Sequence, residues 1–167
     1  SGAALFTASS PSMTAASSFT VTSGSTFPTL ATVTLDGAIC TCSISASGVT
    51  FTQVVINKAS NSTGYPTFTV ASGTTLPLGD NPTIAFNDTN ANTGYYAYFV
   101  NNGTITVGTG TFTFSVDGTI TNSGTISANQ ITSMTFPVDF TNSGTVSMTS
   151  VSTIDFNGSF TNSVAGS

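Results

Sequence analysis

Few residues in this 167-residue chain could do acid–base or nucleophilic chemistry. Histidine is absent, and Lys58 is the only basic residue, beside six acidic ones. The acidic residues are all aspartates and are dispersed: Asp36, Asp80, Asp88, Asp117, Asp139 and Asp155. Without histidine there is no imidazole base, no histidine-oriented triad and no histidine metal ligand. No two aspartates are close enough in sequence to propose the carboxylate pair of a glycosidase. We therefore predict a protein that is not an enzyme and that carries no cofactor or metal.

Cys40 and Cys42 form a C-x-C pair whose sulfurs would project to the same face of a strand. A structural zinc site needs four ligands, and a redox pair usually has C-x-x-C spacing at a helix terminus. The pair is better explained structurally, as a strained disulfide across one residue in an oxidising exterior or as two small buried apolar side chains.

Lys58 permits two interpretations. It is either a solvated lysine at the end of a strand or one half of an isopeptide cross-link to an Asn or Asp side chain. The cross-link requires a lysine made neutral by burial and a nearby carboxyl to transfer protons. The sequence contains both kinds of group without bringing them together.

Four Asn-x-Ser/Thr sequons are predicted N-glycosylation sites: Asn61, Asn87, Asn102 and Asn157. Each lies in a predicted turn or loop. Only 4% of the residues are charged, so a covalently attached glycan would supply hydration that the side chains do not.

The composition predicts an all-β protein. Ser and Thr make up 59 of 167 residues, and Val, Ile and Phe dominate the apolar set, whereas Leu, Glu, Lys and Arg are scarce or absent. No window keeps a helical apolar stripe, and no apolar run approaches the length of a membrane span. With one cation, the chain offers no basic patch for nucleic acid. We therefore expect no nucleic-acid partner and no membrane span.

Residues 19 to about 100 alternate apolar and polar side chains at period two, as in Cys40, Cys42 and Ile44. This alternation favours strands with one buried and one wet face, as in an antiparallel sandwich. We predict a sandwich domain over 19–167, preceded by a low-complexity arm over 1–18.

Residues 101–167 contain an internal repeat in which Asn102, Asn122, Asn142 and Asn162 recur at a constant spacing. In one interpretation Asn-Ser-Gly is a hairpin turn and each repeat unit forms two strands of a meander. In the other, each repeat unit forms one coil of a β-solenoid whose asparagines stack in a ladder. The first half of the chain lacks this period, so the sandwich is the preferred prediction and the solenoid the alternative.

The low charge also indicates a location. A cytosolic domain typically carries about 25% charged residues, compared with 4% here. The chain begins Ser1-Gly2-Ala3, as a processed chain would. We expect an exported, extracellular protein.

The SGAALFTASSPS arm, the Ser/Thr/Asn-rich β pattern and the sequons resemble archaeal surface filament subunits of the thread and bundling-pilus type. In that family each subunit accepts the N-terminal tail of the next by donor-strand complementation. The resemblance implies a jelly-roll-like antiparallel sandwich that lacks one strand, and a homopolymer with a role in adhesion or cell–cell contact. Its donor strand would place either Ala4, Phe6 and Ala8 inward, or Ala3 and Leu5 if the register slips by one. The alternative function is a β-rich adhesin or a binding module of a virion surface.

Overall fold

The computed structural model describes residues 12–15, 18–20, 30–37, 41–45, 51–58, 67–86 and 98–163. All regular structure in these ranges is β-strand. The strands are β1 (Ser12–Ala15), β2 (Ser18–Thr20), β3 (Leu30–Gly37), β4 (Thr41–Ser45), β5 (Phe51–Lys58), β6 (Thr67–Val70), β7 (Thr75–Phe86), β8 (Tyr98–Asn101), β9 (Thr104–Val107), β10 (Gly110–Ser115), β11 (Ile120–Asn122), β12 (Thr125–Asn129), β13 (Ile131–Phe136), β14 (Phe140–Asn142), β15 (Thr145–Thr149), β16 (Thr153–Phe156) and β17 (Phe160–Asn162).

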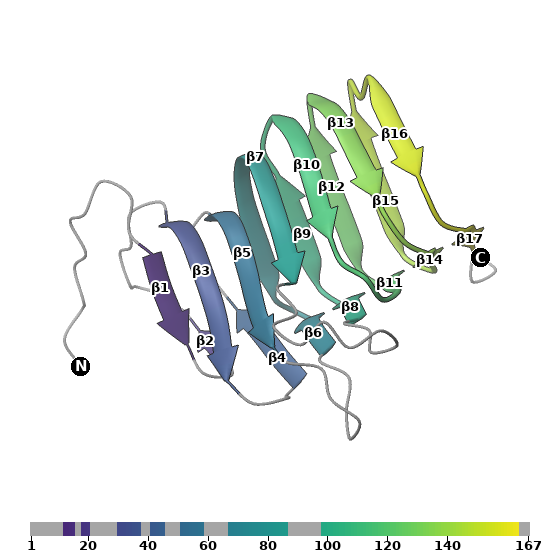
Figure 1. The fold of residues 1–167 in the computed structure, drawn as a ribbon. Helices are drawn as coiled ribbons and strands as arrows, with labels where there is room; N and C mark the ends of the chain where they lie inside the picture. The colour runs from purple at the N-terminus through teal and green to yellow at the C-terminus, as the bar shows by residue number, and fades with distance from the viewer. Residues whose placement is uncertain are drawn as a thin grey trace.

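These strands form a parallel β-solenoid. One sheet has the order β1-β3-β5-β7-β10-β13-β16, with β9, β12 and β15 joined to it through β7. The other has the order β17-β14-β11-β8-β6-β4-β2. Figure 1 shows the strands stacked along one axis from the purple N-terminal strand to the yellow C-terminal one. Residues 98–163 wind through about three coils of three strands each.

The antiparallel jelly-roll prediction is therefore wrong, and the solenoid alternative is confirmed. In the regular coils a strand pairs with its counterpart one repeat later, as Phe140 does with Phe160, and not with its neighbour across a turn. The Asn-Ser-Gly segments are corners between faces of one coil, not hairpin reversals. Period-two alternation fits both architectures because it specifies which side chains point inward and not which strand lies alongside.

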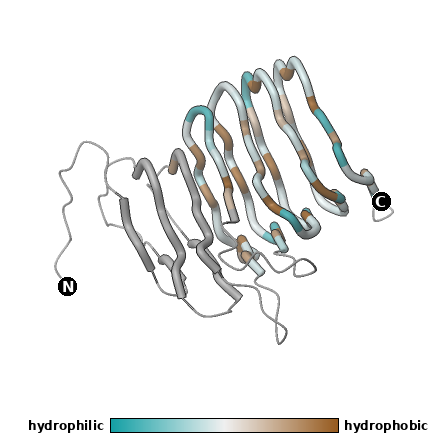
Figure 2. The backbone as a smooth tube through the Cα atoms, in the orientation of Figure 1, coloured by the Kyte–Doolittle hydropathy of each residue, from teal (hydrophilic) through white to brown (hydrophobic). Residues whose placement is uncertain are grey.

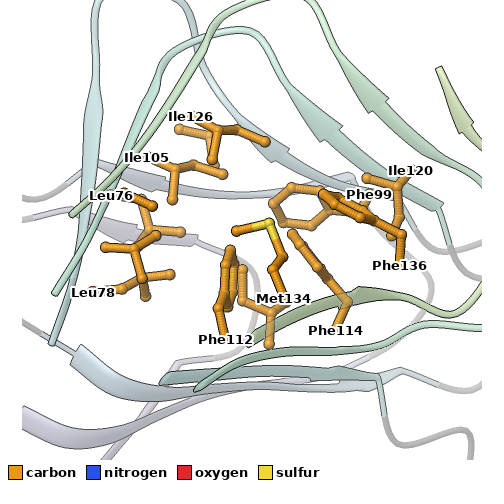
Figure 3. Packing of buried hydrophobic residues seen from close by; sticks show 14 of the residues in the cluster. Leu76, Leu78, Phe99, Ile105, Phe112, Phe114, Ile120, Ile126, Met134 and Phe136 are labelled. Carbon is orange, nitrogen blue, oxygen red and sulfur yellow. The ribbon is translucent and has the colours of Figure 1, made fainter. Parts of the chain in front are cut away.

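The core is the interior of the coils. Apolar side chains alternate with polar ones, so that β8 and β9 both bury every second residue, and Figure 2 shows the same alternation as brown segments between pale ones. In Figure 3, Leu76 and Ile105 from two neighbouring coils of one face lie across the interior from Phe112 and Met134. All four side chains are fully buried.

Strand β7 bends between two faces of the solenoid. Its first half pairs with β9 through Leu76 and Ile105, and its second half pairs with β10 through Ile84 and Phe114. The bend contains Asn81 at φ 49°, in the left-handed region that asparagine tolerates better than most residues. From β8 onward, two separate strands in each coil cover the faces that β7 covers alone.

Candidate functional site: an asparagine ladder and an open coil end

An asparagine ladder runs through one corner of the solenoid, from Asn101 to Asn162. Each Nδ2 donates to the Oδ1 of the asparagine in the next coil, over 2.7 Å from Asn101 to Asn122, 2.7 Å from Asn122 to Asn142 and 2.8 Å from Asn142 to Asn162. Each of the first three also donates to a backbone carbonyl of the following coil or its own corner, as Asn122 does to Thr145 at 3.2 Å. The ladder therefore bonds coil to coil through side chains as well as backbone.

The ladder corrects one detail of the predicted repeat, because its first member is Asn101 and not Asn102. Asn101 stands in register with Asn122, 21 residues later, whereas the next two steps are 20 residues each. Asn102 instead occupies the exposed corner position next to the ladder. The coil from Asn101 to Asn122 has one residue more than the two that follow, so a search for a constant spacing assigns Asn102 to the ladder in place of Asn101.

The ladder begins against an apolar residue. Val70 precedes Asn101 in register, so the Oδ1 of Asn101 is buried without a hydrogen-bond donor. Along the other side of the same corner, Gly103, Gly124 and Gly144 stack closely. A Cβ on Gly124 would lie 2.0 Å from the carbonyl oxygen of Gly103, which accepts the backbone N–H of Thr125 at 2.8 Å. Asparagine and glycine are thus both required by this corner's packing.

Phenylalanines line the interior beside the ladder. Phe136 stacks on Phe114 at 5.4 Å and on Phe156 at 5.0 Å between ring centroids. Phe140 stacks on Phe136 at 4.2 Å and on Phe160 at 5.7 Å. The aromatic column continues from one coil to the next up to the last described strands, and offset stacking adds to the burial energy of each ring.

At β16 and β17 this interior is open. Phe136 and Phe140 are buried beneath the last coil, but Phe156 is 39% exposed and Phe160 50% exposed. Together with Ile154, which is 40% exposed, they are the large exposed apolar side chains within residues 67–86 and 98–163. They line a hollow of about 770 Å³ that reaches back to Phe136 and Asn142. Contiguous exposed aromatic side chains of this kind typically mark an interaction surface.

A second, smaller hollow of about 320 Å³ lies between neighbouring coils and is lined by Asp117, Asp139 and Tyr98, among others. The structure thus brings two aspartates to one hollow, although a full coil of sequence separates them. The Asp139 carboxylate already accepts the backbone N–H of Ser159 at 2.8 Å. From the sequence, only the coil period could have predicted that Asp117 and Asp139 line the same hollow.

Asp80 has a structural role at the bend of β7. Its carboxylate accepts two hydrogen bonds from Thr109, one from the backbone N–H at 2.7 Å and one from the hydroxyl at 2.8 Å. The backbone bond first, and the hydroxyl bond second, hold the pKa of the Asp80 carboxyl below its ordinary value. The neighbouring Asn81 side chain accepts the N–H of Thr111 at 3.0 Å in the same way. These bonds tie the bend to the next coil.

Some predicted site residues lie within the described strands and corners. Asn102 and Asn157 are both exposed corner residues, an accessible location for a glycan, and their modification stays a prediction. Lys58 ends β5 in register with Gly37, and Cys42 lies in β4 in register with Phe68. The remaining predicted positions lie outside the described residues: Ala3, Ala4, Leu5, Phe6, Ala8, Cys40, Asn61 and Asn87.

The described ranges contain no group of three His, Cys, Asp or Glu residues arranged to hold a metal ion. Within the same ranges, no helix has the length and apolarity that a membrane span requires. No protein-family model, curated protein or solved structure matches the chain. The open coil end is therefore the feature from which a function can be argued.

Proposed function

We propose that the protein is a structural subunit of an extracellular filament that assembles from copies of itself. The observation that carries this proposal is the open coil end, where Phe156 and Phe160 are exposed while their counterparts one coil back are buried. Exposed contiguous aromatic side chains favour association, because burying their apolar surface against another chain lowers the free energy.

The outward faces support the same proposal. Thr75, Thr104, Thr125 and Thr145 stand in register on one face, and Thr121, Thr141 and Thr161 on another. These faces carry hydroxyl groups and few charges, so electrostatic repulsion between neighbouring subunits of a polymer would be weak. Filament subunits must meet at very high local concentration, and low charge density reduces the electrostatic cost of that packing.

The bonding between coils also suits a protein that is held under tension. Backbone ladders on both sheets, the asparagine ladder and the aromatic column all run along the solenoid axis. Force along the axis would be shared among these parallel bonds. A protein whose task is mechanical continuity benefits from this arrangement.

Sedimentation velocity and electron microscopy of the purified protein test the proposal. We expect filaments in the wild type and monomers in a Phe160→Asp variant, because a carboxylate at the open end opposes burial of the hollow. Thr161→Asp is the matched control, since it adds the same charge on the same exposed strand at a residue that does not line the hollow. A wild type that stays monomeric at all accessible concentrations contradicts the proposal, as does equal assembly of the two variants.

A further inference from the structure

We infer that the open end of one copy binds the first coil of a second copy, so that β1 extends the sheet that ends in β16 while β2 extends the sheet that ends in β17. The inference rests on the proposed filament function and names the contact that builds the filament. The occupant of the open end is thus a second copy of this chain, placed head to tail.

Both ends of the stack offer strand edges without a partner inside the described part. At one end β16 pairs only with β13 and β17 only with β14. At the other end β1 pairs only with β3 and β2 only with β4. Every described pairing is parallel, so a second copy moved along the solenoid axis presents β1 and β2 in the direction that β16 and β17 require. Unpaired N–H and C=O groups on such edges are ready to hydrogen-bond to another chain.

The register fits both sheets at once. Met13 shares a column with Val33, Val54 and Ile84, and this column continues through Phe114 and Phe136 to Phe156. Placing Met13 of a second copy beside Phe156 therefore continues the column and fixes the register between the two copies.

The second sheet is consistent with the same register. Phe19 shares a column with Ile44, which continues through Val70 to the asparagine ladder and ends at Asn162. Phe19 follows Met13 by as many positions as Asn162 follows Phe156. Placing Phe19 beside Asn162 is therefore the same placement as Met13 beside Phe156.

The spacing between the two columns varies along the chain. The first coil, from Met13 to Phe19, and the last, from Phe156 to Asn162, share one short spacing. The spacing from Phe136 to Asn142 is equally short, and it is much longer in other coils, as it is from Ile84 to Asn101. Within the chain, coils of unequal spacing pair on both sheets, as β10 and β11 do with β13 and β14, so a difference in corner length does not prevent one placement from extending both sheets.

Within the chain, covering a coil buries its aromatic rings. Phe136 is 0% exposed and Phe140 1% exposed beneath the final coil, against 39% and 50% for their uncovered successors. A docked first coil would lie over Phe156 and Phe160 as the final coil lies over Phe136 and Phe140. Asp155 is the sole charged residue on β16 and β17, and β1 and β2 carry none. Electrostatic repulsion therefore does not oppose the contact.

Cysteine cross-linking tests the register. The placement puts Ser12 beside Asp155, so a variant with both Ser12→Cys and Asp155→Cys should form disulfide-linked ladders on non-reducing gels. In the control, Ser12→Cys is combined with Thr153→Cys, two positions out of register on the same strand. That shift moves the Cα atoms to about 8 Å apart, beyond the roughly 7 Å that a disulfide spans. Peptide mass spectrometry separates the engineered bond from any bond of Cys40 or Cys42.

A charge exchange provides a test that needs no cysteine. Ser12→Asp alone places two carboxylates side by side across the contact and should raise the monomer concentration at which assembly begins about two- to fivefold. Ser12→Asp combined with Asp155→Lys makes an opposite pair and should restore assembly to the wild-type level or better. Ser12→Asn, of matched size and no charge, should behave as the wild type.

In-register ladders together with charge rescue support the inference. Filaments visible by microscopy without the in-register link, or with equal linking in the shifted control, overturn the stacking contact and leave the filament function intact. A wild type that forms no filaments overturns both.

Discussion

Replacing Asn122 with alanine should destabilise the solenoid far more than the same change at the end of the ladder. In the native chain Asn122 accepts from Asn101 at 2.7 Å and donates to Asn142 at 2.7 Å and to the Thr145 carbonyl at 3.2 Å. The alanine variant removes these three bonds and a longer one from Asn122 to the Gly124 carbonyl at 3.4 Å, and both neighbouring asparagines are buried. The ladder is then interrupted at its centre, where water does not reach.

The magnitude follows from the groups left unpaired. The Oδ1 of Asn142 loses its donor, and an unsatisfied buried acceptor costs about 1–3 kcal/mol. The Nδ2 of Asn101 loses one bond and keeps its other one to the Thr125 carbonyl at 3.0 Å, which adds about 0.5–1.5 kcal/mol. We expect a total loss of about 1.5–4.5 kcal/mol in the free energy of unfolding.

Asn162→Ala is the matched control. Asn162 is exposed and accepts one bond, from Asn142 at 2.8 Å. The Asn142 amide keeps a second acceptor, the Gly144 carbonyl at 3.2 Å. The expected loss is about 0.5–1.5 kcal/mol.

Urea denaturation followed by circular dichroism measures both variants. A second probe, such as tyrosine fluorescence, shows whether the coils unfold together, because repeat arrays can unfold in parts. Equal stabilities for the two variants, or a loss under about 1 kcal/mol for Asn122→Ala, would refute the view that the buried ladder holds the coils together.

Two further predictions concern the corners. Gly124→Ala should lower the midpoint of thermal unfolding strongly, because the new Cβ would lie 2.0 Å from a backbone oxygen. Ser123→Ala, at the exposed neighbouring position, should leave the midpoint nearly unchanged. Similar midpoints for the two variants would show that the corner relaxes to accept a Cβ. Because hydrogen bonds from Thr109 lower the pKa of Asp80, the carboxylate's contribution to stability is present above the unfolded-state pKa, about 3.9, and is lost as the pH falls through the lower folded-state value. Between about pH 6 and pH 2, the midpoint of thermal unfolding should therefore fall less in the Asp80→Asn variant than in the wild type. Midpoints that fall equally in the two proteins would contradict this role of Asp80.

The local character of the chain could be predicted from its residues. Abundant Val, Ile, Phe and Thr indicate strands, and the alternation at Phe112 and Phe114 indicates which side chains are buried. The asparagine repeat predicts a ladder if the chain coils. The open end could not be predicted, because the exposure of Phe156 and Phe160 depends on where the stack ends and not on their own local pattern.

Sequence alone therefore determined the strand type, the inward and outward faces and the regular period of the second half. Tertiary structure decided that the strands pair in parallel, that Asn101 and not Asn102 begins the ladder, and that Asp117 and Asp139 line one hollow. The physical reason is that side-chain alternation acts within a strand, whereas the choice of partner depends on the length of every corner between coils. Those lengths change along this chain. The sequence separation between Phe68 and its partner Phe99, for example, is much longer than that between Phe140 and Phe160.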